Sequence, residues 1–341
     1  MKPKLLIVEL WGLGDLAIAT PFLRAASGKF QVTLLAKPFA GDLQPRLWPG
    51  VHVEAFTAPW TAFLYKDKYQ LWRWPLREMS HLCHRLAQAR FDFGLSARWD
   101  PRDHLLLQLF NVRERLGFAR VRSRIFLNRP LERPHPEAHR YEFWRILAGE
   151  LSLELPPREK MPVPAPRADR TVLIHTGAAQ PVRVWPLASY QKLAARLRQK
   201  NFTVQIACDA DQRAAWLSAG ETAVATPRNV SELIVLIDRA GAFIGNDSGP
   251  GHLAAVCGVP TFTLFGPQLP EWFAPLHPAA EWLPGRACPY KPCSDYCRFD
   301  TPFCLWDLGV EEVSARVEKF LAAQIPGWDG FTPSQSGLCP P

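Results

Sequence analysis

The sequence has no long uninterrupted apolar run. None of its segments approaches the roughly 20 consecutive apolar residues that a membrane-spanning helix needs. The first ten residues, MKPKLLIVEL, carry two lysines, but Glu9 interrupts their short apolar stretch. This pattern is not that of a signal peptide. We therefore expect no transmembrane segment and a location in the cytoplasm.

Paired C-x-x-C motifs are also absent, although the chain has eight cysteines. Four of them fall in one proline-containing segment: Cys288, Cys293, Cys297 and Cys304. Their spacings of four, three and six intervening residues differ from the usual zinc and iron motifs. A structural zinc or iron site and four reduced, partly buried thiols both remain open. A cytoplasmic location disfavours disulfides.

Acidic residues are scarce relative to basic ones in the first half of the chain. Residues 1–165 contain 25 Lys and Arg against 16 Asp and Glu, whereas the remainder contains 15 against 16. Nine arginines lie between Arg98 and Arg133. Such a patch indicates an anionic partner: an acidic lipid or glycan, a membrane surface or nucleic acid. For any single arginine, solvation of a helix face is the alternative.

The remaining composition is that of a globular α/β protein. A chain of 341 residues, 48% hydrophobic and 21% charged, is too long for one ordinary core and indicates two domains. Apolar spacing predicts helices at 76–89, 141–150, 187–200, 211–218, 231–239 and 310–323. Between them it predicts strands at 4–10, 31–37, 51–57, 91–96, 171–175, 202–208 and 222–225. This alternation predicts parallel sheets covered by helices on both faces.

A proline-rich segment separates the two halves. Residues 155–169 hold five prolines, a density typical of a stiff linker. We predict a Rossmann-like domain at 1–155, a linker at 156–169, a second Rossmann-like domain at 170–325 and a disordered tail at 326–341. The two parallel sheets are expected to face a central cleft.

A glycine-rich loop follows the first predicted strand. Its pattern, Gly12-x-Gly14-x-x-Ala17, fits the dinucleotide-binding fingerprint. An NAD enzyme needs an Asp or Glu at the end of the second strand, where this chain has Lys37. Because a lysine suits a 2′-phosphate, an NAD(P)-dependent oxidoreductase stays an alternative.

A second such loop lies in residues 242–267, where two apolar strands flank a small-residue helix. The chain enters this helix through Asn246-Asp247-Ser248-Gly249. Free N–H groups and the helix dipole favour an anion such as pyrophosphate at this point. Helix capping by Asp247 or Ser248, and a packing role for His252, are the alternatives.

Three segments together resemble glycosyltransferase family 9, the heptosyltransferases. These segments are LLIVELWGLGDLAIATPFLRA (5–25), IHTGAAQPVRVWPLASYQKLAARL (174–197) and GNDSGPGHLAAVCGVPTFTLFGP (245–267). The resemblance spans both predicted domains in order. It implies the GT-B architecture of two Rossmann-like domains, with the acceptor bound by the first domain and the nucleotide-sugar donor by the second.

The resemblance also assigns roles to residues. The family's general base falls on Asp15, after Gly14, where an inverting transfer needs a carboxylate to take the acceptor's proton; a helix cap is the alternative. The family's phosphate-binding lysine is replaced by Arg183, which keeps the charge. Hydroxyl residues found just upstream in some members are replaced here by Gly177, Ala178 and Ala179, so Thr176 is the nearest hydroxyl and backbone N–H groups are the substitute. The donor-binding element falls on Asp247, Ser248, Gly249 and His252.

These roles imply an inverting transfer of heptose from ADP-heptose to an anionic, lipid-linked acceptor of the lipopolysaccharide-core type. A helix amino terminus and a guanidinium would neutralise the departing diphosphate, so no catalytic cofactor is expected. We expect peripheral contact with the inner membrane surface and no nucleic-acid partner. A non-catalytic protein that binds sugar nucleotides or anionic glycans is a further alternative.

Overall fold

The computed structural model describes residues 2–61, 74–162, 171–293 and 295–325. The chain divides into two compact units. The first comprises Met1–Pro162, Arg228–Ile234 and Glu271–Pro278, and the second comprises Val163–Pro227, Val235–Pro270 and Ala279–Pro341. Residues 163–169 of the predicted linker and the predicted tail lie outside the described residues. Within the described ranges, no helix is long and apolar enough to cross a bilayer.

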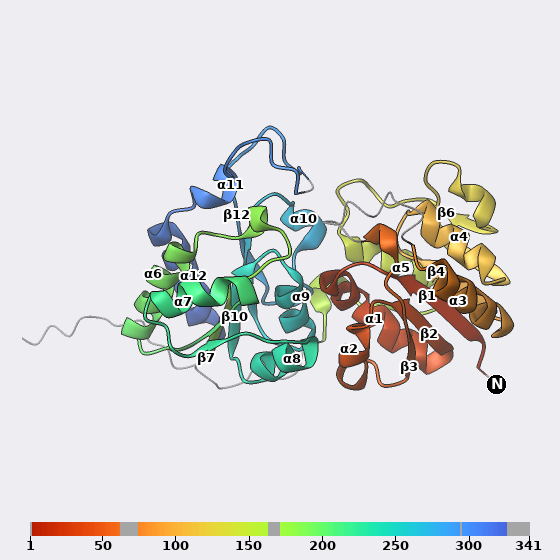
Figure 1. Cartoon of the computed structure of the whole chain (residues 1–341), viewed down its shortest axis with the longest axis horizontal. Coiled ribbons are helices and arrows are strands. Elements are labelled where there is room, and N and C mark those ends of the chain that lie inside the picture. The colour runs from red at the N-terminus through yellow and green to blue at the C-terminus, as the bar shows by residue number, and fades with distance from the viewer. Residues whose placement is uncertain (1, 62–73, 163–170, 294, 326–341) are drawn as a thin grey trace, which may run out of the picture. The chain divides into compact units, whose positions relative to one another are not determined.

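A six-stranded parallel sheet forms the centre of the first unit (Figure 1). The strand order is β3-β2-β1-β4-β5-β6, as in doubly wound dinucleotide-binding folds. The strands are β1 Lys4–Glu9, β2 Gln31–Ala36, β3 Val51–Ala55, β4 Phe93–Ser96, β5 Glu114–Phe118 and β6 Arg129–Leu131. The helices are α1 Leu13–Lys29, α2 Ala40–Leu47, α3 Leu76–Gln88, α4 Pro101–Leu109 and α5 Arg140–Glu150.

Helices cover both faces of this sheet. On one face, α1 packs on α5, and the rings of Phe22 and Trp144 have centroids 5.1 Å apart. On the other face, α3 and α4 contribute leucines to a buried cluster that contains Leu6 and Val8 of β1. Because β1 is buried on both sides, its four central residues, Leu5 to Val8, are apolar without alternation, as expected for a central parallel strand.

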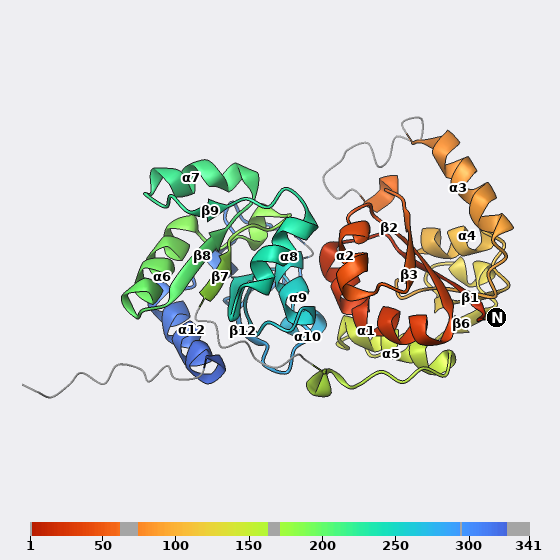
Figure 2. The same ribbon diagram turned by 90° about the horizontal axis from the view of Figure 1, so that it is seen from below.

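The second unit repeats the plan with strand order β12-β11-β10-β7-β8-β9 (Figure 2). The strands are β7 Thr171–His175, β8 Thr203–Ala207, β9 Val224–Ala225, β10 Ala242–Asn246, β11 Thr261–Phe265 and β12 Glu281–Pro284. Its helices are α6 Leu187–Gln199, α7 Arg213–Ser218, α9 Gly249–Val256, α11 Phe303–Trp306 and α12 Val310–Gln324. The helix α8 Val230–Asp238 is divided between the two units after Ile234, and α10 Pro270–Phe273 belongs to the first unit except for Pro270. Tyr190, Trp216 and Phe320, from α6, α7 and α12, pack in one core with the strands.

The predicted alternation of strands and helices is confirmed in both units. The elements missing from the prediction are short or carry charged residues. β5 and β6 lie in the arginine-rich segment, where polar residues interrupt any apolar run, and α7 begins only after a 3-10 turn at Ala210–Gln212. Periodicity is weak in such elements because neighbours, rather than their own sequence, bury them.

The three predicted site loops all follow the carboxyl end of a central strand. Gly12 to Asp15 follow β1, Thr176 and Gly177 follow β7, and Asp247 follows β10. Open parallel sheets bind their ligands at this edge. The strands approach closely here, because a Cβ on Gly245 would lie 2.9 Å from the His175 carbonyl oxygen. Only glycine therefore lets β10 pair with β7 at this position.

Candidate functional site

Asp15 lies in the first turn of α1 in the first unit. Its Oδ2 accepts a hydrogen bond from the Gly12 N–H at 3.0 Å, and its Oδ1 forms an ion pair with Arg98 Nη2. Gly12, not Asp15, is the N-cap residue of α1. One carboxylate oxygen of Asp15 thus accepts a hydrogen bond at the start of α1, and the other pairs with the Arg98 guanidinium. The side chain remains 21% exposed, so a ligand can reach it.

Arg98 is held beside Asp15 from the segment after β4. Its guanidinium lies over the Trp11 ring, 4.8 Å from the centroid, and its backbone N–H donates to Ser96 Oγ at 3.1 Å. Burial alone lowers the pKa of Arg98, but the carboxylates of Asp15 and Glu9 outweigh it and raise this pKa. Arg98 is therefore a permanent cation that pairs with the Asp15 side chain.

Two further carboxyls surround this guanidinium, and both are buried. Burial, followed by the charge of Asp15, raises the pKa of Glu9 to about 8. Burial also raises the pKa of Asp103 to about 7, although the Ser96 hydroxyl donates to its Oδ2 at 3.0 Å and opposes the shift. Near neutral pH, Glu9 therefore retains its proton.

Lys37 and Arg140 are further cations that interact electrostatically with Asp15. Lys37 follows β2, at the position where a dinucleotide enzyme carries its ribose-binding carboxylate. Burial lowers the pKa of Lys37, while the charges of Asp15 and Glu9 oppose that shift. The Lys37 side chain therefore interacts electrostatically with the carboxyl groups of Asp15 and Glu9.

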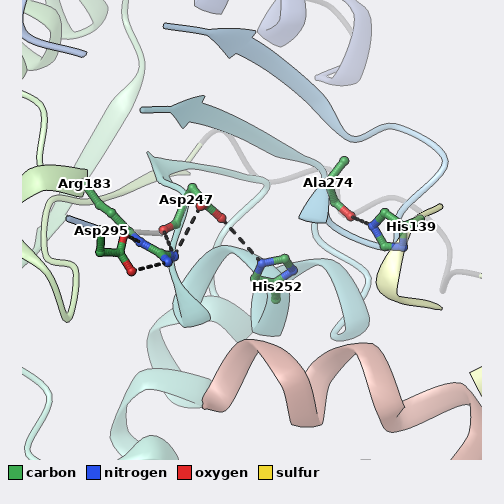
Figure 3. Close-up of polar contacts among 6 residues, drawn as sticks. All are labelled: His139, Arg183, Asp247, His252, Ala274 and Asp295. Carbon is green, nitrogen blue, oxygen red and sulfur yellow. Dashed lines mark hydrogen bonds and ion pairs between the residues drawn. The ribbon is translucent and has the colours of Figure 1, made fainter. Parts of the chain in front are cut away.

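Arg183 is the centre of the polar site in the second unit (Figure 3). Its Nε and Nη2 donate to the two carboxylate oxygens of Asp295 at 2.6 and 2.8 Å. Its Nη1 lies 3.3 Å from both the backbone oxygen and Oδ2 of Asp247. The guanidinium is thus oriented by two carboxylates, as expected for planar, bidentate recognition.

Asp247 and His252 extend this site along α9. Asp247 is 2% exposed, and its Oδ1 lies 3.9 Å from His252 Nε2 (Figure 3). The neighbouring Asn246 fixes the loop: its Oδ1 accepts from the Trp185 N–H at 3.0 Å and the Tyr190 hydroxyl at 2.9 Å. Its Nδ2 donates to the Thr176 carbonyl oxygen at 2.9 Å, which ties the loops after β7 and β10 together.

The amino end of α9 presents buried polar atoms without partners. Ser248 occupies the N-cap position, yet its side chain makes no capping hydrogen bond. Among the described residues, Ser248 Oγ and His252 Nδ1 are buried and have no hydrogen-bond partner. Buried polar atoms are rarely left unpaired, so these two indicate a polar ligand. The alternative in which the Ser248 side chain serves only to cap the helix is therefore wrong.

Thr176 and Gly177 lie beside a second polar group of the same unit. Thr176 Oγ1 donates to Gln212 Oε1 at 2.8 Å, so its hydroxyl hydrogen is already used. A Cβ on Gly177 would lie 2.2 Å from Asp209 Oδ2, so a larger residue here would have to displace the Asp209 side chain. A pocket of about 250 Å³ is lined in part by Asp209, Asp211 and Trp185. These two aspartates form an Asp-x-Asp pattern that sequence analysis overlooked.

The four clustered cysteines line one small pocket with Tyr290, Phe299 and Phe303. Burial raises the pKa of the Cys293 and Cys304 thiols. Across the described residues, however, no three His, Cys, Asp or Glu side chains are arranged to hold a metal ion. The thiols of Cys288, Cys293, Cys297 and Cys304 therefore do not form the tentative zinc or iron site in this arrangement.

Within each unit, the predicted residues lie together. Arg183, Asp247, Ser248, Gly249 and His252 share one site, and Asp15 has its own charged surroundings. Sequence analysis missed Glu9 and Asp295 as site members. Glu9 carried a usable signal, because a charged residue at the end of an otherwise apolar central strand is rarely buried without a role.

Replacing Glu9 with Gln is expected to change how stability depends on pH. With a pKa of 4.5 in the unfolded chain and about 8 when folded, Glu9 takes up a proton on folding between these values. Stability of the wild type therefore falls as pH rises through this window. Glu9→Gln lacks this loss, so its melting temperature should rise relative to wild type from about pH 5 to about pH 8.

Scanning calorimetry across this range checks the expectation, with the exposed Glu137→Gln as a matched control. Parallel pH profiles for wild type and Glu9→Gln would contradict it.

Comparison with known proteins gives three likenesses. Lipopolysaccharide heptosyltransferase 1 of Pseudomonas aeruginosa is 29% identical over 222 residues, 59% of this chain and 59% of that protein. The match thus spans less than two thirds of the relative. The structure of E. coli heptosyltransferase WaaC with ADP aligns with a TM-score of 0.71 at 17% identity, covering 93% of this chain and 99% of that chain.

A third likeness is to the dodecameric iron-containing heptosyltransferase TibC from enterotoxigenic E. coli, in complex with ADP-D-beta-D-heptose. It aligns with a TM-score of 0.56 at 14% identity, covering 95% of this chain and 78% of that chain. With the two parallel sheets, the structural likenesses confirm the expected GT-B architecture of two Rossmann-like domains.

The sequence profile of glycosyltransferase family 9 (heptosyltransferase) matches residues 79–300, which is more than half of the chain. The oxidoreductase alternative is therefore wrong. The chain belongs to glycosyltransferase family 9.

Proposed function

We propose that this protein is an inverting glycosyltransferase that moves a heptose from ADP-heptose to an anionic acceptor of the lipopolysaccharide-core type. The observation that carries the proposal is the pair of buried, unpartnered polar atoms at the amino end of α9, Ser248 Oγ and His252 Nδ1. Membership of family 9 supports the reaction class. The solved complexes of WaaC with ADP and of TibC with ADP-D-beta-D-heptose support the choice of donor.

The second unit would hold the donor. The free N–H groups of Ser248 and Gly249 and the α9 dipole suit a diphosphate. Arg183 would add a guanidinium, and His252 Nδ1 would donate or accept at a phosphate or sugar oxygen. The pocket beside Asp209 and Asp211 suits the ribose hydroxyls, which carboxylates bind well.

Asp15 would act as the general base. The acceptor hydroxyl oxygen attacks the anomeric carbon, its proton passes to Asp15, and the bond from that carbon to the diphosphate oxygen breaks. ADP leaves with the bonding electrons. The ion pair with Arg98 would orient the Asp15 side chain before the reaction, and neutral Glu9 adds no repelling negative charge.

The proposed reaction requires no catalytic cofactor. The charge that develops on the departing diphosphate would meet the α9 amino terminus and Arg183, which are fixed before the reaction begins. We propose an anionic glycolipid as acceptor, and a cytoplasmic protein that contacts the inner face of the membrane peripherally. No nucleic acid is expected to bind. In a non-catalytic protein that binds sugar nucleotides, Asp15 would have no role as a general base.

Asp15→Asn should lower turnover about 10²- to 10⁴-fold, the usual range for loss of a general base. Donor affinity should stay near the wild-type value, because Asp15 belongs to the acceptor-binding unit. Steady-state transfer assays with ADP-heptose and deacylated lipopolysaccharide core measure the first quantity, and calorimetry with ADP the second. Glu137→Gln is the control for the loss of one carboxylate in this unit. Normal turnover of Asp15→Asn would contradict the role as general base and leave Asp15 only its hydrogen bond from Gly12 at the start of α1.

Arg183→Ala should weaken ADP binding at least about tenfold, because a charge-assisted hydrogen bond to phosphate contributes roughly 1.5–3 kcal/mol. Arg196→Ala is a matched control: Arg196 also bonds two carboxylates, Glu311 and Glu318, in the second unit. Isothermal titration calorimetry with ADP compares the two variants. Equal affinities would remove Arg183 from the donor site.

The four clustered cysteines give a separate test. Because their thiols do not converge on one point among the described residues, we expect the purified, reduced protein to contain well under one zinc or iron ion per chain. Elemental analysis measures this content. One ion per chain, lost in Cys293→Ser but kept in the Cys83→Ser control, would show that the thiols rearrange around a structural metal.

A further inference from the structure

Four large aliphatic side chains of the first unit are exposed on two neighbouring elements. Leu105 and Leu109 of α4 are 38% and 51% exposed. Val121 and Ile125, between β5 and β6, are 79% and 74% exposed. Single exposed aliphatics are ordinary. These four differ because α4 packs directly on the 3-10 helix η4, Ser123–Phe126, which follows Val121 and contains Ile125.

Buried polar contacts hold the two elements together. His104 Nδ1 of α4 lies 2.9 Å from Ser123 Oγ, and this oxygen also accepts from the Arg120 N–H at 3.0 Å. Both side chains are buried. A Cβ on Gly117 would lie 2.8 Å from His104 Nε2, so β5 also packs closely against the histidine. These buried contacts therefore fix the backbone of residues 120–125, from which the exposed side chains project.

Val121 adopts a strained backbone conformation in this loop. Its φ is +52°, in the left-handed region that β-branched residues avoid. With most of its side chain exposed, burial within this chain does not offset the strain. Strain of this kind usually persists where the local geometry serves a function. Here the geometry turns an aliphatic side chain outward.

Arginines alternate with these aliphatic residues, and the structure divides the arginine patch into two groups. Arg115 Nε donates to the Phe126 carbonyl oxygen at 2.7 Å, and Arg129 bonds Glu114 and Glu150, so both stabilise the fold. Arg120, Arg122 and Arg124 are exposed and take part in no ion pair among the described residues. No acidic residue occurs in residues 119–131, so this surface is strongly positive.

We propose that this surface, formed by α4 and residues 120–125, docks the protein onto an anionic lipid bilayer. Val121 and Ile125 enter the boundary between headgroups and acyl chains, while Arg120, Arg122 and Arg124 contact the lipid phosphates. Exposed aliphatic residues interspersed with basic ones are typical of interfacial membrane binding. Nucleic acid would instead favour aromatic side chains for stacking, and none is exposed in this loop. The inference rests on the proposed function, since a lipid-borne acceptor requires work at a membrane.

Vesicle sedimentation tests the proposal on the full chain. Wild type should co-sediment with equimolar phosphatidylcholine and phosphatidylglycerol vesicles, and not with phosphatidylcholine alone. The triple variant Arg120→Gln, Arg122→Gln, Arg124→Gln should bind about 100-fold more weakly, since each basic residue near an anionic surface contributes roughly one kcal/mol. The control triple variant Arg213→Gln, Arg316→Gln, Lys319→Gln removes the same charge from exposed positions of the second unit and should bind like wild type.

The double variant Val121→Ser, Ile125→Ser should lose about tenfold in vesicle affinity at moderate salt, because buried aliphatic groups resist salt while charge contacts do not. Leu217→Ser with Val235→Ser, two aliphatics of other helices that are 39% and 49% exposed, is its control. Turnover of the Val121→Ser, Ile125→Ser variant on a water-soluble, deacylated acceptor should equal that of wild type.

The outcomes separate this inference from the proposed function. Wild-type binding to both vesicle types alike, no vesicle binding, or equal effects of target and control variants would overturn the docking surface, whatever the transfer assay gives. Vesicle binding with the expected losses, but no transfer to any acceptor, would uphold the surface and contradict the proposed reaction.

Discussion

Parallel pairing of every strand in both sheets is the constraint on which the rest of the structure depends. Each strand must be followed by a crossover, so the residues after β1, β7 and β10 all lie at the carboxyl edge of a sheet. At that edge the following helices begin with unpaired N–H groups. Polar and charged side chains collect where the backbone already favours anions. Both candidate sites, around Asp15 and around Asp247, follow from this arrangement.

Each unit holds an arginine guanidinium close to several carboxyl groups, and the charges of these groups are balanced differently in the two units. In the first unit, the Arg98 guanidinium interacts with the carboxyl groups of Asp15, Glu9 and Asp103. Burial raises the pKa of Glu9 and of Asp103, which reduces the excess of negative charge. In the second, Arg183 is shared between Asp295 and Asp247. The Arg183 side chain is 24% exposed, so in the reaction that we propose a departing diphosphate would compete for this guanidinium. The first unit thus holds Asp15 in an ion pair with Arg98, and the second holds Arg183 between two carboxylates.

Much of the fold could be predicted from sequence because central parallel strands are apolar on both faces. The apolar runs of β1 and β7 are therefore clear in the sequence, whereas β5, with Glu114 and Arg115, and the three-residue β6 are not. Asp247 and Ser248 stand out in the sequence because they follow such a strand directly, whereas Asp15 is singled out only by the resemblance to family 9. Asp295 could not, since it reaches Arg183 across more than 100 residues from a segment without periodicity. The partition of the arginines into structural and exposed groups likewise depends on contacts such as Arg115 to Phe126, which no spacing reveals.

The central claim is that Asp15 assists direct displacement at the anomeric carbon of an ADP-activated heptose. The most direct test is to incubate the protein with ADP-heptose and a deacylated lipopolysaccharide core, and to determine the anomeric configuration of the new linkage by NMR. The account predicts transfer with the configuration inverted relative to the donor. A product with retained configuration, or donor turnover without any new glycosidic linkage, would contradict it.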